Sequence, residues 1–498
     1  MSELFKKIIS HCKEYGFIFN SSEIYDGLSA VYDYGPLGVE LKNNIKSYWW
    51  DSMVKMHKNI VGLDSSIFMH PDTWKASGHI DAFNDPLIDN KDSKKRYRAD
   101  VLIEDYIEKI KSKIQKDIDK AKKRYGDDFN EQEFLNTNER ILNRKTQINK
   151  ILIHMQKCLE SENVNGIKKL IEELNIKCPV SGTNNWTDVR QFNLMFKTKI
   201  GSNTETSSDL YLRPETAQGI FVNFLNVQKS TRQKIPFGIA QIGKAFRNEI
   251  VARQFIFRMR EFEQMEMQFF IKPGEENKWY EYWKNIRMEW HLSLGFKKDD
   301  FKFKKHEKLA HYAKNACDIE FNFPFGFKEV EGIHSRSDFD LSQHQKFSGK
   351  KIQYFDSEIN KNYIPYVIET SIGTDRMFLA CLCAAFREEK ENKRIVLKIP
   401  NKLAPIKVAI FPLTKTPLLI NIANNIYDEI KMGHNCFYEE KDSIGKRYRR
   451  QDAIGTPFCI TIDDESLNDN KVTIRERDSM KQERIEMNKI KEYINNRL

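Results

Sequence analysis

The stretch AFRNE at residues 245–249 and the stretch FRMREFEQME at residues 257–266 decide the expected fold of this chain. Charged and aromatic side chains recur at every second position, which is the period of a β-strand. We therefore expect two adjacent strands joined by a loop. A sheet face that carries Arg, Phe and Glu makes a poor core but a good floor for a nucleotide, because Arg binds phosphates and carboxylates hold an amine or a metal.

Five residues of these stretches should share faces at a spacing of two. Arg247 and Glu249 should point the same way, as should Phe262, Gln264 and Glu266. The alternative is a solvated sheet face with cross-strand ion pairs. The neighbouring runs PFGIAQI at 236–242 and MEMQFFI at 265–271 are strongly apolar, so this sheet is expected to be buried and largely antiparallel.

Two further motifs lie outside this pair of strands. The run VIETSIGTDR at 367–376 predicts a strand, a turn at Gly373 and an apolar helix headed by Arg376, where anions are favoured. An Arg that caps a neighbouring carbonyl is the alternative. The run RPETAQG at 213–219 predicts a helix start that carries Glu215, for which simple N-terminal capping is the alternative.

Composition sets broad limits on the protein. The chain has 498 residues, of which 40% are hydrophobic, and a net charge of +10, which suits a partner with a phosphate backbone but does not require one. The eight cysteines form no C-x-x-C pair and indicate a reducing compartment. No run approaches the ~20 apolar residues that span a bilayer, and no secretory signal is legible, so we expect a cytoplasmic protein without a membrane partner.

The chain changes character twice. Residues 100–176 are rich in Lys and Glu with apolar residues at helical spacing, which predicts long amphipathic helices that form either an arm or a solvated spacer. After a Pro-marked linker near Ala404, strand patterns at 406–411, 459–463 and 471–475 surround a helix pattern at 418–432. This alternation predicts a small separate α/β domain.

Taken together, these stretches resemble the class II aminoacyl-tRNA synthetases. RNE at 247–249 is similar to motif 2 of that class and GTDR at 373–376 to motif 3. The helix GVELKNN at 38–44 and the strand that ends at His70 are similar to motif 1, the dimer-forming element.

More specific strings resemble the glycyl-tRNA synthetases. They are ASGH at 76–79, RYRAD at 96–100, RQFNLMF at 190–196, PETAQG at 214–219, FRMREFEQME at 257–266, SIGKRYRRQD at 443–452 and IGTP at 454–457. Two departures stand out. The string GIHSR at 332–336 differs from the usual one at His334 and Ser335, and only Cys178 remains where some family members carry cysteine pairs, so we predict no structural zinc.

The resemblance implies an α+β fold: a class II synthetase catalytic domain built on an antiparallel sheet, with a helical insertion and a C-terminal α/β anticodon-binding domain. We expect the catalytic domain at 1–99 and 185–403, the insertion at 100–184 and the anticodon-binding domain at 404–498. It also implies a homodimer that joins glycine to tRNA(Gly) with ATP and Mg²⁺ in protein biosynthesis.

By the same resemblance, we expect four sets of site residues. The catalytic residues would be Arg247, Glu249 and Arg376. The ATP-binding residues would be Arg247, Asn248, Glu249, Phe257, Arg258, Phe262, Glu329, Val330, Gly373, Asp375 and Arg376, with Glu329 as the Mg²⁺ ligand. The glycine-binding residues would be Arg98, Glu215, Phe262, Gln264, Glu266, Arg336, Glu369, Ser371 and Gly373. The tRNA-binding residues would be Lys446, Arg447, Tyr448, Arg449 and Arg450.

Two other functions remain open at this point. The chain could be a class II synthetase for another small amino acid such as proline, serine or threonine, although the carboxylates of PETAQG and FEQME argue against it. It could also be a non-catalytic nucleic-acid-binding relative, which should have lost the phosphate-binding arginines; Arg247, Arg258 and Arg376 are all present.

Overall fold

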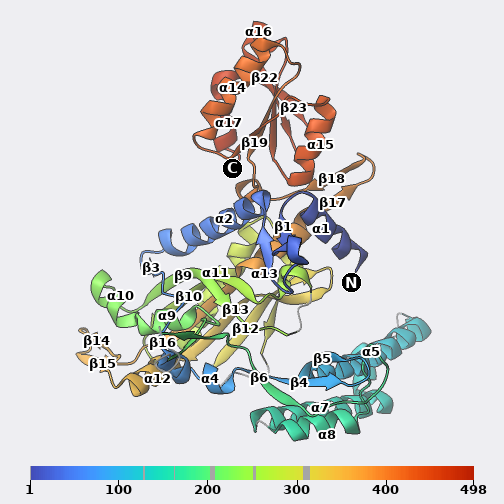
Figure 1. Ribbon diagram of the computed structural model, residues 1–498, viewed down its shortest axis with the longest axis vertical. Coiled ribbons are helices and arrows are strands. Elements are labelled where there is room, and N and C mark those ends of the chain that lie inside the picture. Colours follow the sequence, from blue (N-terminus) through green and yellow to red (C-terminus); the bar gives the residue numbers. More distant parts are fainter. Residues whose placement is uncertain (1, 127–128, 162, 202–207, 251–253, 307–313) are drawn as a thin grey trace. The chain divides into compact units, whose positions relative to one another are not determined.

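The computed structural model describes residues 2–126, 129–161, 163–201, 208–250, 254–306 and 314–498, which divide into two compact units (Figure 1). The first unit contains the chain up to Ser77, the segment Phe196–Arg247 and the chain from residue 254 onward. The second unit contains Gly78–Met195 and the short segment that begins at Asn248.

A seven-stranded sheet with the order β11-β12-β13-β16-β10-β9-β3 forms the centre of the first unit (Figure 1). Its strands are β3 Ile60–Gly62, β9 Phe237–Phe246, β10 Glu261–Ile271, β11 Phe301–Lys305, β12 Asn315–Phe323, β13 Gly326–Ser337 and β16 Tyr366–Gly373. Every neighbouring pair is antiparallel except β3 and β9, which are parallel. The expected antiparallel sheet is confirmed.

One face of this sheet carries polar side chains in two rows. Because residues directly opposite each other on neighbouring strands share a face, the register fixes the rows. The first row is Asp318, Gly332, Ser371, Glu266 and Gln241. The second row contains His334, Glu369 and Gln268.

The opposite face is apolar and packs against helices. Met265, Met267 and Phe269 alternate with the polar residues of β10 and enter the main core. Helices α2 Pro36–Trp50, α11 Glu276–Ser293 and α13 Thr374–Ala385 contribute to the same core. Burial of these large side chains on one face is what stabilises a sheet whose other face is polar.

A charged triad is buried between α11 and β13. Glu331 accepts a hydrogen bond from Arg287 Nε at 2.6 Å and lies 2.8 Å from His291 Nε2, and none of the three side chains is more than 2% exposed. Burial alone would raise the pKa of Glu331, but Arg287 and His291 together hold it below its ordinary value. The triad ties α11 to the sheet.

The second unit is built mainly from helices. Its long helices are α5 Ala99–Tyr125, α7 Glu139–Glu160 and α8 Val164–Glu173, and its small sheet has the order β5-β4-β6. The strands are β4 Asn84–Asn90, β5 Lys95–Arg98 and β6 Arg190–Asn193. Isoleucines recur along one face of α5 at helical spacing and are buried, as the sequence pattern predicts.

Cys178 of the second unit lies among hydroxyl groups. Its sulfur is 3.4 Å from Ser93 Oγ and 3.2 Å from Tyr97 Oη. The hydroxyl groups of Ser93 and Tyr97 therefore both contact the sulfur of Cys178.

The C-terminal part of the first unit has its own five-stranded sheet with the order β20-β19-β21-β22-β23. Its strands are β19 Val408–Pro412, β20 Cys436–Tyr438, β21 Phe458–Ile462, β22 Lys471–Glu476 and β23 Gln482–Glu486. Helices α14 Pro417–Lys431 and α17 Ile490–Asn495 contribute to an apolar cluster on this sheet. The pairs around β19 are parallel and the other pairs antiparallel. Among the described residues, no helix is long and apolar enough to cross a membrane.

One expectation about the central strands is wrong. Strand β9 ends at Phe246, and only the backbone N–H of Arg247 continues the ladder, with a 2.8 Å hydrogen bond to the carbonyl of Arg260. Asn248 and Glu249 belong to the second unit. Arg247 and Glu249 therefore do not share a strand face. The other set does: Phe262, Gln264 and Glu266 alternate along β10.

We predict that Glu331→Gln destabilises the protein strongly. The substitution keeps the side-chain shape but leaves Arg287 buried without its counter-charge, which costs about 3–5 kcal/mol for comparable buried pairs. The measurement is the thermal unfolding midpoint of the full chain. Glu281→Gln is the matched control, because Glu281 forms an exposed pair with Lys284 on the same helix. Equal midpoints for the two variants would show that the triad does not hold α11 to the sheet.

Candidate active site

Glu369 is the centre of the polar face of the seven-stranded sheet. Its Oε2 accepts hydrogen bonds from Arg336 Nη1 at 2.9 Å and from Gln268 Nε2 at 2.7 Å, and its Oε1 lies 2.7 Å from His334 Nδ1. Arg336 is held in turn by Asp340 through two hydrogen bonds of 2.8 and 2.9 Å. Burial alone would raise the pKa of Glu369, but Arg336 and His334 lower it below its ordinary value, so this carboxylate is ionised.

Glu266 is a second buried carboxyl group on the same face. It accepts hydrogen bonds from the hydroxyl of Thr216 and, at 2.9 Å, from Gln268 Nε2. Burial raises the pKa of Glu266 well above its ordinary value, and the negative charges of Glu369 and Glu215 raise it further. Gln268 therefore donates to two carboxyl groups whose pKa values are shifted in opposite directions, that of Glu369 downward and that of Glu266 upward.

Glu215 is the third carboxylate of the set. It lies in the PETAQG segment just before α9, which spans Ala217–Val222, and it is half-buried. Its Oε1 accepts a 3.0 Å hydrogen bond from Gln218 Nε2. Glu215 acts electrostatically on both Glu266 and Glu369. Three carboxyl groups from three separate chain segments thus meet at one place, which suits a cationic ligand.

Two smaller side chains border these carboxyl groups. Gln264 Nε2 donates to Ser371 Oγ at 3.3 Å, and Gln264 Oε1 accepts from the backbone N–H of Thr216 at 3.1 Å. Gly373 follows at the end of β16 with an ordinary negative φ of −73°. A Cβ atom on Gly373 would approach the side chain of Arg376 only to 3.4 Å, so the fold itself tolerates a side chain here.

A second cluster gathers arginines around Glu329. Arg376, at the start of α13, forms an ion pair with the Glu329 carboxylate at 3.0 Å and stacks over the Phe257 ring at 4.5 Å. Partial burial would raise the pKa of Glu329, but Arg376, His334 and Arg247 lower it below its ordinary value. Arg376 and Arg247, which are far apart in the sequence, therefore act on one carboxylate.

Arg247 is anchored from both sides. Its Nε donates to the carbonyl of Pro214 at 3.0 Å, and its guanidinium lies 5.1 Å from the centre of the Phe262 ring. Arg258 directly follows Phe257, the residue under Arg376, and is half-buried. The segments that carry Arg247, Arg258 and Phe262 thus border the polar face beside Glu329.

Two residues of the expected ATP set have a different role in the structure. Val330 is 1% exposed and packs in the apolar core, because a register shift between Ile319 and Glu320 turns its side chain away from the polar face. Asp375 is buried and bound by three donors: the Tyr34 hydroxyl, Lys42 Nζ at 2.8 Å and the backbone N–H of Glu263 at 2.8 Å. The Asp375 carboxylate holds the fold together and does not face the site.

Three expected site residues belong to the second unit. Arg98 lies 2.9 Å from Asp85 and 2.6 Å from Asp100 in two ion pairs and acts electrostatically on Glu249. The backbone N–H of Asn248 donates to the carbonyl of Leu194 at 2.8 Å. The structure therefore brings Arg98 and Glu249 into one unit, and Glu215, Glu266, Glu369 and Ser371 into the other.

The expected tRNA-binding patch is narrower than the sequence suggests. Arg447 is 2% exposed and donates to the carbonyls of Pro412, Leu413 and Glu439, so it is a structural residue of α15 Ile444–Ile454.

The three side chains that follow Arg447 are also engaged within the protein. The Tyr448 hydroxyl is 2.6 Å from Thr461 Oγ1 and its ring lies under Arg475, so it is not a free stacking surface. Arg450 pairs with Glu439 and Asp442. Arg449 donates to the carbonyls of Asn392 and Lys393 but remains exposed, as does Lys446.

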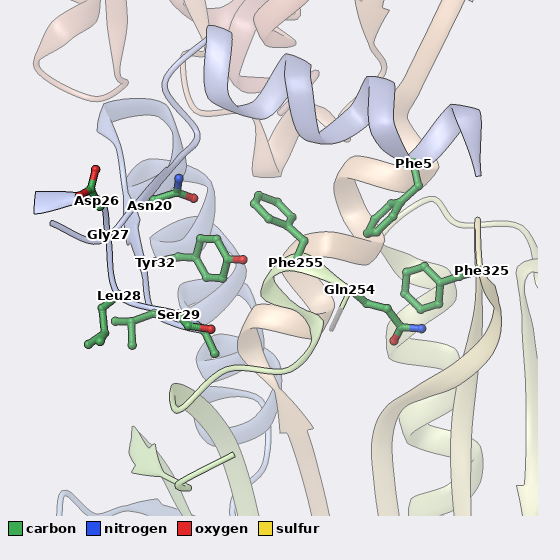
Figure 2. Close-up of a pocket in the computed structure, with 12 residues that line it drawn as sticks. Phe5, Asn20, Asp26, Gly27, Leu28, Ser29, Tyr32, Gln254, Phe255 and Phe325 are labelled. Atoms are coloured by element: carbon green, nitrogen blue, oxygen red, sulfur yellow. The ribbon is translucent and has the colours of Figure 1, made fainter. Parts of the chain in front are cut away.

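A surface hollow of about 790 Å³ lies elsewhere in the first unit, between Phe5, Tyr32, Phe255 and Phe325 (Figure 2). None of the expected site residues lines it. Its lining contains aromatic rings and small polar groups, with Asp26 as its one carboxylate and no arginine. The chemistry of the protein therefore points to the sheet and not to this hollow.

Sequence reasoning missed several side chains that build the site. Gln268 lies two residues beyond Glu266, so the same alternation that marked Glu266 could have found it. Asp340 lies four residues after Arg336 and Thr216 adjoins Glu215. His334 was noticed only as a departure from a motif, and its contact with Glu369 depends on the pairing of β13 with β16.

The arrangement can bind a small cation and a polyanion side by side. The carboxyl groups of Glu215, Glu266 and Glu369 suit an ammonium group, and Arg376 and Arg247 suit phosphates. These are the two requirements for activation of an amino acid by a nucleoside triphosphate. No side chain among these is a strong nucleophile, which agrees with a reaction that depends on positioning and charge stabilisation.

Comparison with known families covers most of the chain. The tRNA synthetase class II core domain (G, H, P, S and T) matches residues 196–386, the glycyl-tRNA synthetase insertion domain 1 matches residues 85–194, and the anticodon binding domain matches residues 407–497.

Curated relatives match over nearly their whole length. The glycine–tRNA ligase of Chlorobaculum tepidum is 49% identical over 496 residues, which are 99% of this chain and 99% of the relative. Those of Macrococcus caseolyticus and Staphylococcus haemolyticus are 48% and 47% identical, over 99% and 98% of this chain and 98% and 97% of the relatives. With this identity over nearly its full length, the chain belongs to the glycyl-tRNA synthetase family of class II aminoacyl-tRNA synthetases.

Proposed function

We propose that this chain activates glycine with ATP on the polar face of the seven-stranded sheet and transfers it to tRNA(Gly). The reaction is that of its family. The observation that supports the location is the meeting of Glu215, Glu266 and Glu369 beside the pair formed by Glu329 and Arg376. An amino acid held by its ammonium group at the carboxyls would direct its own carboxylate toward the arginines.

The arginines would bind and stabilise the triphosphate. In the first step, a carboxylate oxygen of glycine attacks the α-phosphorus of ATP, the bond to the bridging oxygen breaks, and pyrophosphate leaves. Arg247 would hold the α-phosphate and Arg258 and Arg376 the outer phosphates, while Phe262 would stack on adenine. No protein base is required, because the attacking carboxylate is already anionic. We assign Glu249 and Asn248 to the adenine side, and Phe257 supports Arg376.

Glycine would be selected by exclusion. The pocket has to hold an ammonium group and leave no room for a β-carbon, so a larger amino acid would clash and disturb buried charges. Ser371 and Gln264 border the carboxyl groups, Arg336 orients Glu369, and Gly373 places no side chain beside Arg376. We also keep Arg98 in this set as a proposal.

Glu329 fits one ligand position of a magnesium ion. Its carboxylate is ionised and 47% exposed, and Mg²⁺ prefers oxygen ligands while it keeps several waters. When bound, the ion would neutralise phosphate charge. In the free protein, Arg376 forms an ion pair with the Glu329 carboxylate, so binding of the triphosphate and Mg²⁺ would have to break this ion pair.

The C-terminal part would bind the tRNA. We propose Lys446 and Arg449 as the phosphate contacts, since both are exposed on α15. The domain limits 1–99, 100–184, 185–403 and 404–498 stay a proposal. So do a homodimer formed through the motif 1 helix, now α2, and a cytoplasmic location.

Pyrophosphate exchange tests the substrate. We expect glycine to drive exchange of labelled pyrophosphate into ATP, and proline, serine, threonine and alanine to give less than about 1% of the glycine rate, since steric exclusion can discriminate far more than a missing methylene. A second amino acid that drives exchange as well as glycine would contradict the proposed pocket. A chain without exchange for any amino acid would be a non-catalytic relative.

Ser371→Ala should weaken the use of glycine more than the use of ATP. Removal of one neutral hydrogen bond is worth about 1 kcal/mol, so we expect the KM for glycine to rise about 3- to 10-fold and the KM for ATP to change less than about 2-fold. Both constants come from the exchange assay.

Ser335→Ala is the matched control for this prediction. Ser335 is buried on the adjacent strand β13 and pairs with Ile368, so it lies on the apolar face of the same sheet. It should leave both constants unchanged. A rise in the KM for ATP with an unchanged KM for glycine in Ser371→Ala would remove Ser371 from the glycine site.

Glu266→Gln should stabilise the free protein at neutral pH and lower its activity. The folded-state pKa of Glu266 is raised above its unfolded value, so folding takes up a proton between these two pKa values and stability falls there as pH rises. Glutamine does not titrate, so its burial carries no pH-dependent cost in the free energy of folding. The gain in the free energy of unfolding should therefore be small near pH 4.5 and should grow by up to about 1.4 kcal/mol per pH unit above it, and the thermal midpoint should rise in parallel.

Thermal midpoints of both proteins from pH 4.5 to 8 measure this effect. Glu276→Gln is the control, because Glu276 pairs with Lys314 and its pKa is lowered from its ordinary value. It should destabilise the protein slightly, with the opposite pH trend. A Glu266→Gln variant that is less stable than the natural protein at pH 8 would show that Glu266 is ionised in the free site.

A further inference from the structure

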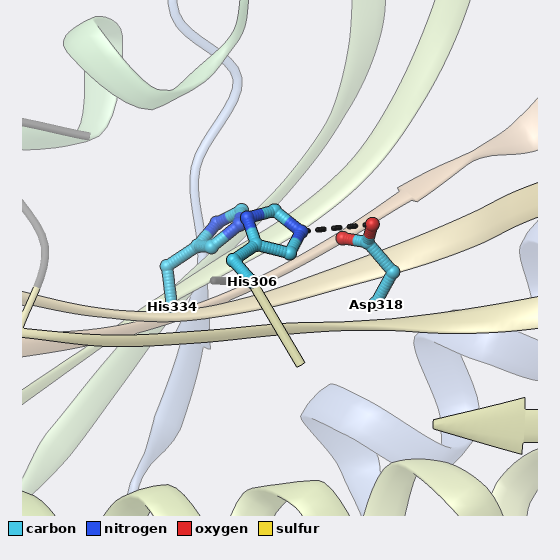
Figure 3. A group of neighbouring side chains, drawn as sticks. All are labelled: His306, Asp318 and His334. Carbon is cyan, nitrogen blue, oxygen red and sulfur yellow. Dashed lines mark ion pairs between the residues drawn. The ribbon is translucent and has the colours of Figure 1, made fainter. Parts of the chain in front are cut away.

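His306, Asp318 and His334 form a cluster beside the proposed glycine pocket (Figure 3). One ligand atom from each side chain lies within 4.8 Å of the other two. His306 Nε2 is 2.8 Å from Asp318 Oδ2, and the two imidazole rings are 5.8 Å apart between centres. Among the residues that the structure describes, this is the group of His, Cys, Asp and Glu side chains that could hold a metal ion.

The sheet positions the three side chains. Asp318 lies on β12 directly opposite Gly332 of β13, and His334 lies two residues further along β13 on the same face. His306 follows directly after β11, the neighbouring strand, and its backbone N–H donates to Ala316 of β12 at 3.0 Å. The ligands therefore come from three adjacent strands, which is the rigid support that a metal site needs.

Gly332 directs the imidazole of His334 toward Asp318. A Cβ atom on Gly332 would meet His334 Cε1 at 2.9 Å and Nε2 at 3.5 Å, so the ring lies directly over this glycine. Since Gly332 pairs with Asp318, the Nε2 edge of the ring reaches toward the carboxylate. Any residue larger than glycine would displace the ring.

The second nitrogen of His334 is already engaged. Its Nδ1 lies 2.7 Å from Glu369 Oε1, which leaves Nε2 as the atom available to a metal. A carboxylate that accepts the proton of a ligating histidine is the common outer partner in metal sites, where it fixes the tautomer and the ring orientation. Glu369 supplies that partner here.

The charge of the surroundings also suits a cation. The Asp318 side chain is only 13% exposed, and the carboxylate of Glu329 acts on it electrostatically. A hydrogen bond from His306 alone can satisfy Asp318, as in an ordinary ion pair. His334 also acts electrostatically on Asp318, and a metal ion would use all three groups at once.

We propose that His306 Nε2, Asp318 and His334 Nε2 bind one divalent transition-metal ion of the zinc class. Two imidazoles and one carboxylate suit zinc and its neighbours, with a fourth position for water, whereas Mg²⁺ prefers oxygen ligands alone. The site is separate from Cys178 and from the proposed Mg²⁺ ligand Glu329. Through His334 it adjoins Glu369, so the ion would share its outer partner with the glycine pocket.

Zinc binding to the untagged full-length chain tests this proposal. The apoprotein is dialysed against buffered Zn²⁺ in millimolar Mg²⁺ without ATP, and zinc per chain is measured by elemental analysis. Co²⁺ titration provides a second readout, because a site with nitrogen ligands and low coordination number gives visible absorption bands. The natural chain should bind one tight equivalent that Mg²⁺ does not displace.

Two ligand variants and one control decide the outcome. His306→Gln and Asp318→Asn should each weaken this binding at least about 10-fold, the lower limit for loss of even an outer partner. His434→Gln should bind as the natural chain does, since the imidazole of His434 lies in the C-terminal part, 2.7 Å from Asn495 Oδ1. His306 is 31% exposed at a strand end, so its variant is expected to fold normally.

Three results would overturn the proposal. They are the absence of a tight equivalent in the natural chain, equal zinc affinity in the natural chain and in both ligand variants, and displacement of zinc by millimolar Mg²⁺. If one ligand variant unfolds, as judged by its thermal midpoint, the other variant decides. Neither readout uses aminoacylation, so a failure of the proposed glycine site would leave this test unaffected.

Discussion

The meeting of three carboxyl groups at the polar face of the seven-stranded sheet is the constraint on which the rest of this structure depends. Carboxylates this close repel each other, and burial makes the repulsion stronger. The protein reduces this repulsion by giving the carboxyl groups different surroundings, which shift their pKa values in opposite directions. Arg336 and His334 lower the pKa of Glu369, whereas burial beside Glu369 and Glu215 raises the pKa of Glu266, which lies between Thr216 and Gln268. An ammonium ion is the ligand that would relieve the remaining repulsion.

The rest of the fold keeps this strained face in place. The carboxylate of Asp375 binds Lys42 of α2, Tyr34 and the backbone of Glu263 in β10, so a single side chain joins the three segments that resemble motifs 1, 2 and 3. The triad around Glu331 fixes α11 on the apolar side of the same sheet. Asp375, which the sequence places in the ATP-binding set, thus stabilises the scaffold, while the carboxyl groups on the polar face remain incompletely compensated.

The sequence predicted the architecture better than the partners of individual residues. Alternation along β10 correctly grouped Phe262, Gln264 and Glu266, because period-2 patterns depend only on local geometry. It failed at Glu249, because the strand ends at Phe246. The resemblance placed Val330 in the ATP set, but a register shift turns its side chain into the apolar core. Arg447 and Tyr448 lie in a basic string, but their burial depends on contacts with Pro412 and Thr461 far away in the chain.

Proton release on glycine binding tests the central asymmetry most directly. The number of protons released is measured by calorimetric titration of glycine into the protein in the presence of a non-hydrolysable ATP analogue. The titration is repeated near pH 7.5 in two buffers of different ionisation enthalpy. If Glu266 is neutral in the free site, the ammonium group should lower its pKa and release up to ~1 proton per glycine bound. Binding heats that are the same in both buffers, or that show proton uptake, would contradict the account.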